Sequence, residues 1–210
     1  MKLSSLALRT GTVAVVGAVL VCGAVAVANA DELDDSNVDV NVEINQIEEP
    51  GVLALTVAPG AATLTESGST ALVRQFIGTL PTVTVTDTRD PEEIPEGSAW
   101  TVLGTASAFT GSAGQAPIPA GNLGWSPALV QGDQEGLVSA GLEVQTVLDA
   151  PSQPGNNVGL VDQELLFATG DSGAINPEGQ WSANAQLFLR TGINVAPGNY
   201  TSTLTLSLFE

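Results

Sequence analysis

The stretch that decides the fold is TVTVT, residues 82–86. Its two valines alternate with three threonines, so one face of the segment is apolar and the other is polar. A period of two is typical of a β-strand that is half-buried in a sheet, and β-branched residues favour strands. The stretch therefore predicts a strand, and the question becomes how far the same pattern extends.

Similar alternation recurs on both sides of this stretch. Before it lie the segments 38–44, 52–57 and 72–76, and after it lie 100–106, 181–189 and 204–208. Proline and glycine pairs such as Pro50-Gly51 and Pro59-Gly60 mark turns between them. No segment keeps a helical apolar stripe over three turns. The pattern predicts an all-β chain, a single antiparallel β-sandwich (jelly-roll or immunoglobulin-like) of about ten strands, with loops at 111–124 and 150–157 and no substantial helix.

The first thirty residues have the features of a secretory signal peptide. Lys2 and Arg9 precede an uncharged apolar stretch, residues 11–27, and Ala28-Asn29-Ala30 supplies a cleavage site of small residues. Two alternatives stay open: a membrane anchor, because this stretch is near the lower length limit for a span, and a lipoprotein attached through Cys22. We predict a signal peptide over 1–30, a flexible acidic leader over 31–36 and a β-sandwich domain over 37–210.

The charge of the chain excludes several partners. It has 5 basic and 23 acidic residues and no histidine, for a net charge of −18, which becomes −20 after the predicted cleavage. Such a chain cannot neutralise phosphates, so nucleic acid is excluded. Anionic lipid surfaces would repel it, and we expect no stable membrane insertion after cleavage. The cleaved chain would also lack cysteine, so no disulfide is expected.

Enzymatic chemistry has little support in the sequence. The stretch GDSG, residues 170–173, looks like the nucleophile motif of trypsin-like serine proteases, but no histidine exists to take the hydroxyl proton. A tight turn between two strands is the better interpretation. A glycosidase needs a selected pair of carboxylates, and 23 acidic residues select none. We predict a protein that is not an enzyme and has no cofactor, with one calcium alternative.

That alternative concerns an acidic, proline-rich loop before Trp100. Five of its side chains offer the hard oxygen ligands that Ca²⁺ prefers, although their spacing matches no EF-hand. A solvated loop is favoured, and a calcium site is the alternative. The candidate ligands are Asp87, Asp90, Glu92, Glu93 and Glu96.

The tryptophans are the other candidates for function. Trp181 shares the apolar phase of its segment and is predicted to lie in the core. Trp100 and Trp125 flank a glycine-rich loop, where an indole could be partly open to a ligand.

Several motifs carry a resemblance to a known family. They are GTLPTVTVTDTR at 78–89, AWTV at 99–102, SAFTG at 107–111, IPAGNLGW at 118–125 and APGNYTSTLTL at 196–206. Together they resemble the WxL-domain family of Gram-positive surface proteins, in its high-GC actinobacterial form. The likeness runs from about Val38 to the end of the chain. It implies a secreted, β-rich domain that associates non-covalently with the cell wall, with peptidoglycan as the type of ligand.

The two signatures of that family fall on named residues. The first, Trp-x-Leu, corresponds to Trp100, Thr101 and Val102, with valine in the leucine place. The second corresponds to Tyr200, Leu206 and Leu208, with Leu206 in the place of a tryptophan. These six residues, together with Trp125, are the predicted binding residues.

The expected function is therefore that of a secreted, non-enzymatic surface protein that binds peptidoglycan or another wall polymer. The alternative is a self-assembling adhesive or structural coat subunit, in which an edge strand near 201–209 pairs with another copy or another surface protein.

Overall fold

The computed structural model describes residues 51–131 and 136–210. The fold belongs to the unit Ile47–Glu210, which is separate from the unit Met1–Gln46. The predicted signal peptide, the acidic leader and the strand expected at 38–44 lie outside the described residues.

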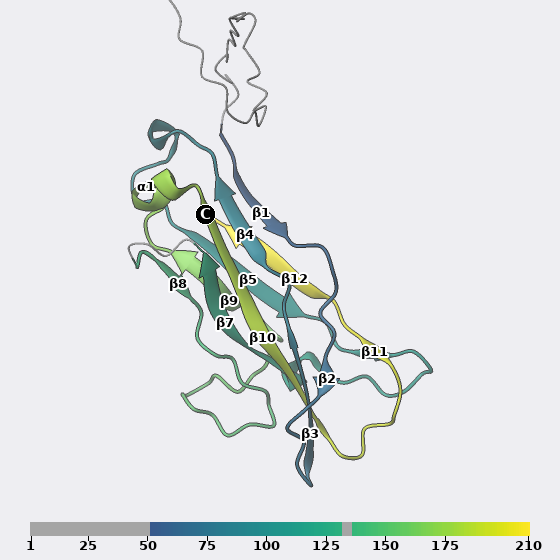
Figure 1. The fold of residues 1–210 in the computed structure, drawn as a ribbon. Coiled ribbons are helices and arrows are strands. Elements are labelled where there is room, and N and C mark those ends of the chain that lie inside the picture. The colour runs from purple at the N-terminus through teal and green to yellow at the C-terminus, as the bar shows by residue number, and fades with distance from the viewer. Residues whose placement is uncertain (1–50, 132–135) are drawn as a thin grey trace, which may run out of the picture. The chain divides into compact units, whose positions relative to one another are not determined.

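The first sheet is built on one long strand, β10 (Gln180–Gly192). Two strands, β4 (Val83–Asp87) and β3 (Val73–Thr79), pair in succession with one edge of β10, and β7 (Leu123–Gln131) pairs with its other edge. Outside them, β1 (Leu53–Val57) pairs with β4 and the two-residue β2 (Thr65–Glu66) pairs with β3 (Figure 1). All these pairs are antiparallel.

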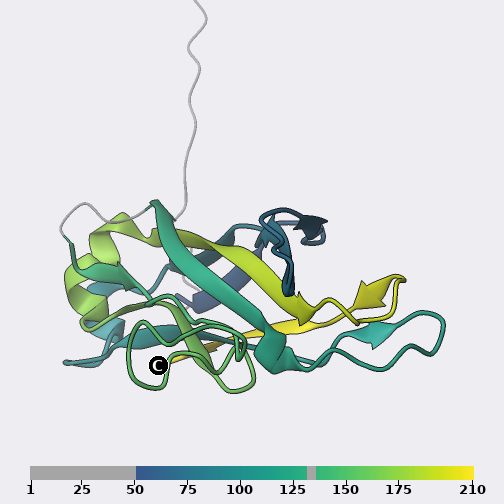
Figure 2. The same ribbon diagram turned by 90° about the horizontal axis from the view of Figure 1, so that it is seen from below.

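The second sheet has the order β12-β5-β9-β8 and is also antiparallel. Its strands are β12 (Leu204–Phe209), β5 (Trp100–Ala106), β9 (Glu164–Thr169) and β8 (Val138–Ala140). A small separate pair joins β6 (Thr110–Gly111) to β11 (Tyr200–Thr201). Figure 2 shows β10 and β12 in different layers of the fold.

The helical segments are short and lie in connections. They are η1 (Pro91–Glu93), η2 (Ala120–Asn122), α1 (Ser172–Ile175) and η3 (Asn176–Glu178). Within 51–131 and 136–210, no helix has the length and apolarity needed to cross a membrane.

Aromatic side chains fill the core between the two sheets. Trp100 of β5 packs against Trp181 of β10, with ring centroids 5.6 Å apart, and edge-on against Phe167 of β9 at 5.3 Å. Trp100, Trp125 and Trp181 have no exposed surface. The Trp181 indole N–H donates to Glu178 at 3.0 Å. The all-β sandwich and the core position of Trp181 are therefore confirmed.

The predicted strands at 52–57, 72–76, 82–86, 100–106, 181–189 and 204–208 are present; the strand at 100–106 has the predicted bounds, and the others shift by one to three residues at their ends. The described residues form twelve strands, three of only two residues, against the ten or so expected for the whole domain.

Two local predictions are wrong. The loop expected over 111–124 ends at Leu123, where β7 begins, because Leu123, Gly124 and Trp125 are buried in succession and show no alternation. The segment 170–173 does connect β9 to β10, but as the start of a helix. The Asp171 carboxylate accepts the Ala174 N–H at 3.0 Å and so caps α1.

Candidate binding groove

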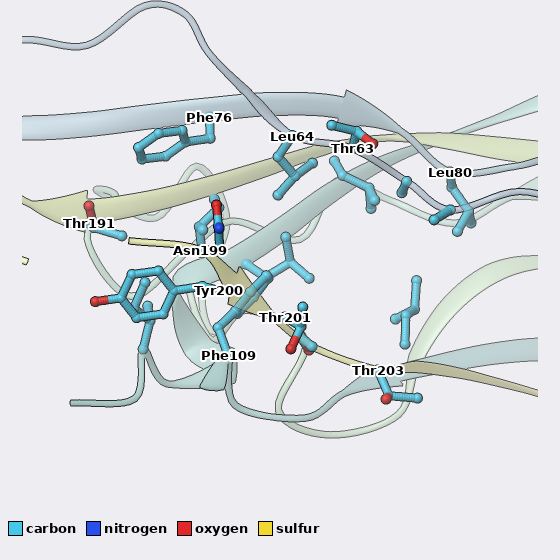
Figure 3. A pocket seen from close by; sticks show the side chains of 18 of the residues that line it. Thr63, Leu64, Phe76, Leu80, Phe109, Thr191, Asn199, Tyr200, Thr201 and Thr203 are labelled. Atoms are coloured by element: carbon cyan, nitrogen blue, oxygen red, sulfur yellow. The ribbon is translucent and has the colours of Figure 1, made fainter. Parts of the chain in front are cut away.

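An apolar groove of about 1080 Å³ opens between the two sheets, beside β1 and β12. Aliphatic side chains form its walls: Leu55 and Val57 from β1, Leu187 and Leu189 from β10, and Leu204 and Leu206 from β12. Figure 3 shows Phe76 and Leu64 on one side of the groove and Tyr200 and Phe109 on the other. The volume is slightly above the usual range of about 300–1,000 Å³ for ligand-binding cavities, and such cavities are likewise lined mainly by apolar side chains.

Both strands that border the groove are edge strands. In the described sheets, β1 ends the order of the first sheet and β12 ends the order of the second. Each is hydrogen-bonded to one neighbour, β4 for β1 and β5 for β12. Their outer edges therefore carry backbone N–H and C=O groups with no strand partner among the described residues.

The groove stays open because the chain leaves one ladder after β1 and joins a different one at β2. The Ala58 N–H still donates to the Thr82 carbonyl at 2.8 Å, but Pro59 has no N–H and Gly60 has a φ of 133°. Pairing begins again only at β2, which pairs with β3 so that Thr65 faces Ile77. In between, residues 60–64 line the groove instead of extending the sheet.

On the opposite side, a short kink directs the chain away from β12. The Thr203 N–H donates to the Ser107 hydroxyl at 2.9 Å, and the Ser202 hydroxyl donates to the Ser107 carbonyl at 2.7 Å. These bonds separate β12 from β11, so that residues 195–203 form the far wall. The Tyr200 hydroxyl donates to the Ala196 carbonyl at 2.8 Å, which holds its half-buried ring against the groove.

The polar groups at the rim are neutral or already paired. Arg74 lines the groove, but its guanidinium donates to both carboxylate oxygens of Glu66 at 2.9 and 2.7 Å. Hydrogen bonds from Arg74 and then Ser69 lower the pKa of Glu66 to about 2, so the pair stays ionised. The other polar lining residues are uncharged: Thr63, Thr191, Asn199, Thr201, Ser202 and Thr203. The groove is therefore suited to an uncharged, mainly apolar ligand.

The structure separates the predicted binding residues into two groups. Tyr200 and Leu206 line the groove. Leu208, further along β12, packs partly buried against the core. Thr101 and Val102 belong to β5, where Val102 is fully buried and Thr101 faces the other way, half-buried.

The expectation that Trp100 and Trp125 are partly open is wrong, because neither has any exposed surface. Trp100 occupies one of the buried positions of β5, in which buried and half-buried residues alternate. Trp125 lies over Gly104 of the opposite sheet, which leaves room for the indole. Their indole N–H groups find no acceptor among the described residues, although a buried indole N–H usually has one.

The calcium prediction is also not supported by the geometry. Asp87 is the buried last residue of β4, and its carboxylate accepts hydrogen bonds from the Arg89 side chain at 2.9 and 2.7 Å. Burial alone would raise the pKa of Asp87, but the bonds and charge of Arg89 outweigh it and lower the pKa. Glu93 accepts the backbone N–H groups of Asp90 and Gly51.

The remaining members of the acidic set, Glu92 and Glu96, are exposed, as is Asp90. In the part of the chain that the structure describes, no three acidic, cysteine or histidine side chains gather as a metal site would require. The five predicted ligands are thus not brought together, because two of them hold the loop itself in place.

Comparisons with known proteins add no assignment to this picture. A scan against protein-family models and searches of curated proteins and of solved structures found no match to this chain.

Several groove residues carried no functional signal in the sequence. These residues lie at the apolar positions of predicted strands, and such positions are equally typical of a closed core. They are Leu55, Val57, Leu187 and Leu189. The one local signal is Pro59-Gly60, which ends β1 and precedes the unpaired residues 60–64, since a missing ladder can expose the apolar face beneath it.

Proposed function

We propose that this chain is a secreted, non-enzymatic surface protein whose groove binds an extended polypeptide segment as an added β-strand. The observation that carries the proposal is that the apolar groove occurs at the same place as two strand edges, those of β1 and β12, that have no strand partner among the described residues.

An added strand uses both features at once. Its backbone hydrogen-bonds to a free edge, and every second side chain enters an apolar groove. On β12, Leu204 and Leu206 face the groove while Thr205 between them is exposed. A segment with apolar residues at alternate positions would match this spacing.

The arrangement of charges supports binding in preference to catalysis. Each of the three arginines beyond the predicted signal peptide is paired with a carboxylate: Arg74 with Glu66, Arg89 with Asp87, and Arg190 with Asp149. The chain has no histidine, and the groove lining contains no acidic residue. General acid–base catalysis most often uses a histidine or a carboxylate, and the described lining offers neither.

A labelled peptide tests this proposal. The probe is a fluorescein-labelled, blocked heptapeptide with valine at alternate positions and threonine or asparagine between them, and fluorescence anisotropy measures its binding. We expect saturable binding to the wild-type chain, a loss of tenfold or more with Leu206→Asp, and no change with Thr205→Asp. Absence of binding, or equal effects of the two substitutions, would overturn the proposal.

A second candidate function is association with the cell wall through glycan at the same rim. The half-buried ring of Tyr200 faces the groove beside Asn199, Thr201 and Thr203, which is a combination of one aromatic face and neutral polar groups (Figure 3). Co-sedimentation with purified wall sacculi tests it. We expect Tyr200→Phe to pellet like wild type and Tyr200→Ala to remain in solution, with circular dichroism confirming that both fold. Wild-type protein that stays in the supernatant would exclude this candidate.

A further inference from the structure

We propose that the strand which fills the groove is residues 38–44 of a second copy of this chain, so that copies join head to tail. This inference rests on the proposed function, because it names the partner of the same groove.

The sequence of residues 38–44 has the pattern that the groove requires. Apolar Val38, Val40, Val42 and Ile44 alternate with polar residues, so a strand over this segment has one apolar face. At about 3.3 Å per residue the segment spans roughly 23 Å, close to the length of the six-residue β12. The segment lies outside the described residues, and the pattern is read from the sequence alone.

The groove, for its part, has apolar surface that no described strand covers. The Val57 side chain is 47% exposed, although it belongs to a strand that borders the groove. Leu55, Leu204 and Leu206 are only half-buried, whereas the residues of β10 opposite them are buried. One more apolar-faced strand would complete the burial of these leucines.

A second copy fits better than the same chain. The chain enters β1 with the Gly51 N–H bonded to Glu93 and the Val52 N–H bonded to Thr88, at the Leu53 end of that strand. The groove lies at its other end, where Val57 and residues 60–64 line it. A strand from another molecule can enter there directly.

Charge sets the conditions for this assembly. Each copy carries a net charge of −20 after the predicted cleavage, so copies repel each other at low ionic strength. Salt screens this repulsion, while the apolar contact in the groove does not depend on it. Assembly through residues 38–44 should therefore increase with salt concentration.

Cysteine trapping between two differently tagged copies tests the inference. After the predicted cleavage the chain has no cysteine, so only introduced thiols can react. One copy of the cleaved chain, residues 31–210, carries Val42→Cys and the other carries Leu204→Cys, and the matched control pair is Asn41→Cys with Thr205→Cys. Under mild oxidation, we expect the first pair to give at least tenfold more mixed disulfide dimer than the control pair. The mixed dimer is identified by its mass.

Two results would overturn the inference. One is equal yield of mixed dimer from the two pairs. The other is a doubly substituted Val42→Cys/Leu204→Cys chain that forms only an intrachain bond, since this would place the segment in its own groove.

Sedimentation velocity gives a second readout in the intact chain. We expect wild type to form concentration-dependent oligomers that Val42→Asp abolishes and Asn41→Asp retains, because only residue 42 is in the apolar phase. If Val42→Asp has no effect while the labelled peptide still binds the groove, this inference fails and the proposed function stands. If the peptide does not bind either, both fail.

Discussion

Gly104 of β5 lies directly beneath the indole of Trp125 of β7. A Cβ atom added to Gly104 would come within 2.5 Å of Cη2 and 2.9 Å of Cζ3 of that ring. Trp125 is fully buried, so the ring has no solvent-side space into which it can move. The two sheets therefore approach each other at this point because one residue has no side chain.

Gly104→Ala should for this reason destabilise the fold. Overpacking of a filled core typically costs about 1–3 kcal/mol, and urea unfolding followed by tryptophan fluorescence measures it. The matched control is Gly192→Ala at the exposed end of β10, where an added Cβ meets nothing within 4 Å. The control should stay within about 1 kcal/mol of wild type. Equal losses in the two variants would contradict the packing argument.

The same contact explains why the strands could be predicted and the exposure of the tryptophans could not. Alternation around Val83 and Val85 is local, and it correctly predicts β4 and its buried face. Whether Trp125 is open depends on Gly104, which lies on the other sheet and is distant in the sequence. The glycine-rich loop next to Trp125 in the sequence indicated an exposed ring. In the fold, the ring instead fills the space that Gly104 leaves on the other sheet.

The groove was harder to predict from the sequence than the burial of the tryptophans. Tyr200 and Leu206 were found through a motif, yet Leu55 and Leu187 look like ordinary core residues in the sequence. They line a groove because β1 and β12 end their sheets on the same side, and the order of strands is a property of the whole fold. In the acidic loop the deciding contact is local: the Asp87 carboxylate accepts from Arg89, two residues along the chain, and the sequence pattern alone did not indicate this pair.

Trp100→Ala should unfold a large part of the population instead of removing a binding site. The ring is fully buried and packs on Phe167 and Trp181, and truncation of a core aromatic costs about 3–5 kcal/mol. Thermal unfolding by circular dichroism measures the loss. Trp100→Phe keeps part of the packing and should lose less. A Trp100→Ala chain with wild-type stability would show that the ring is not a core residue.

Arg89→Met should be far more damaging than Arg74→Met. Arg89 is paired with the buried Asp87 and also donates to Glu210 at 2.7 Å, and loss of its side chain leaves a buried carboxylate without its charged partner, with only the backbone N–H of residue 89 at 3.1 Å. Such a loss costs about 3–5 kcal/mol. Arg74 pairs with Glu66 on the surface, where solvent screens the two charges and the pair contributes little to stability. Equal losses of stability at pH 7 would contradict this difference.

The cost of Arg89→Met should also depend on pH. The pKa of Asp87 is lowered in the folded wild type, so the pair stabilises the fold above the unfolded-state pKa of about 3.9 and this contribution is lost as the pH falls through the lower folded pKa. Chemical unfolding from pH 7 down to pH 2 should show the gap between wild type and variant becoming smaller. A gap of constant size would mean that the charge of Asp87 is not its cause.

Glu164→Gln should act in the opposite direction and stabilise the protein at pH 7. Burial, and secondarily the charge of Asp162, raises the pKa of Glu164 in the folded state. The folded chain then binds a proton more readily than the unfolded chain, so stability falls as the pH rises from about 4.3 through the raised pKa. Glutamine carries no charge and avoids this penalty. We expect a higher Tm than wild type at pH 7, no difference below about pH 4, and no gain from the same substitution at the exposed Glu143. A gain that persists at low pH would assign the effect to packing instead of ionisation.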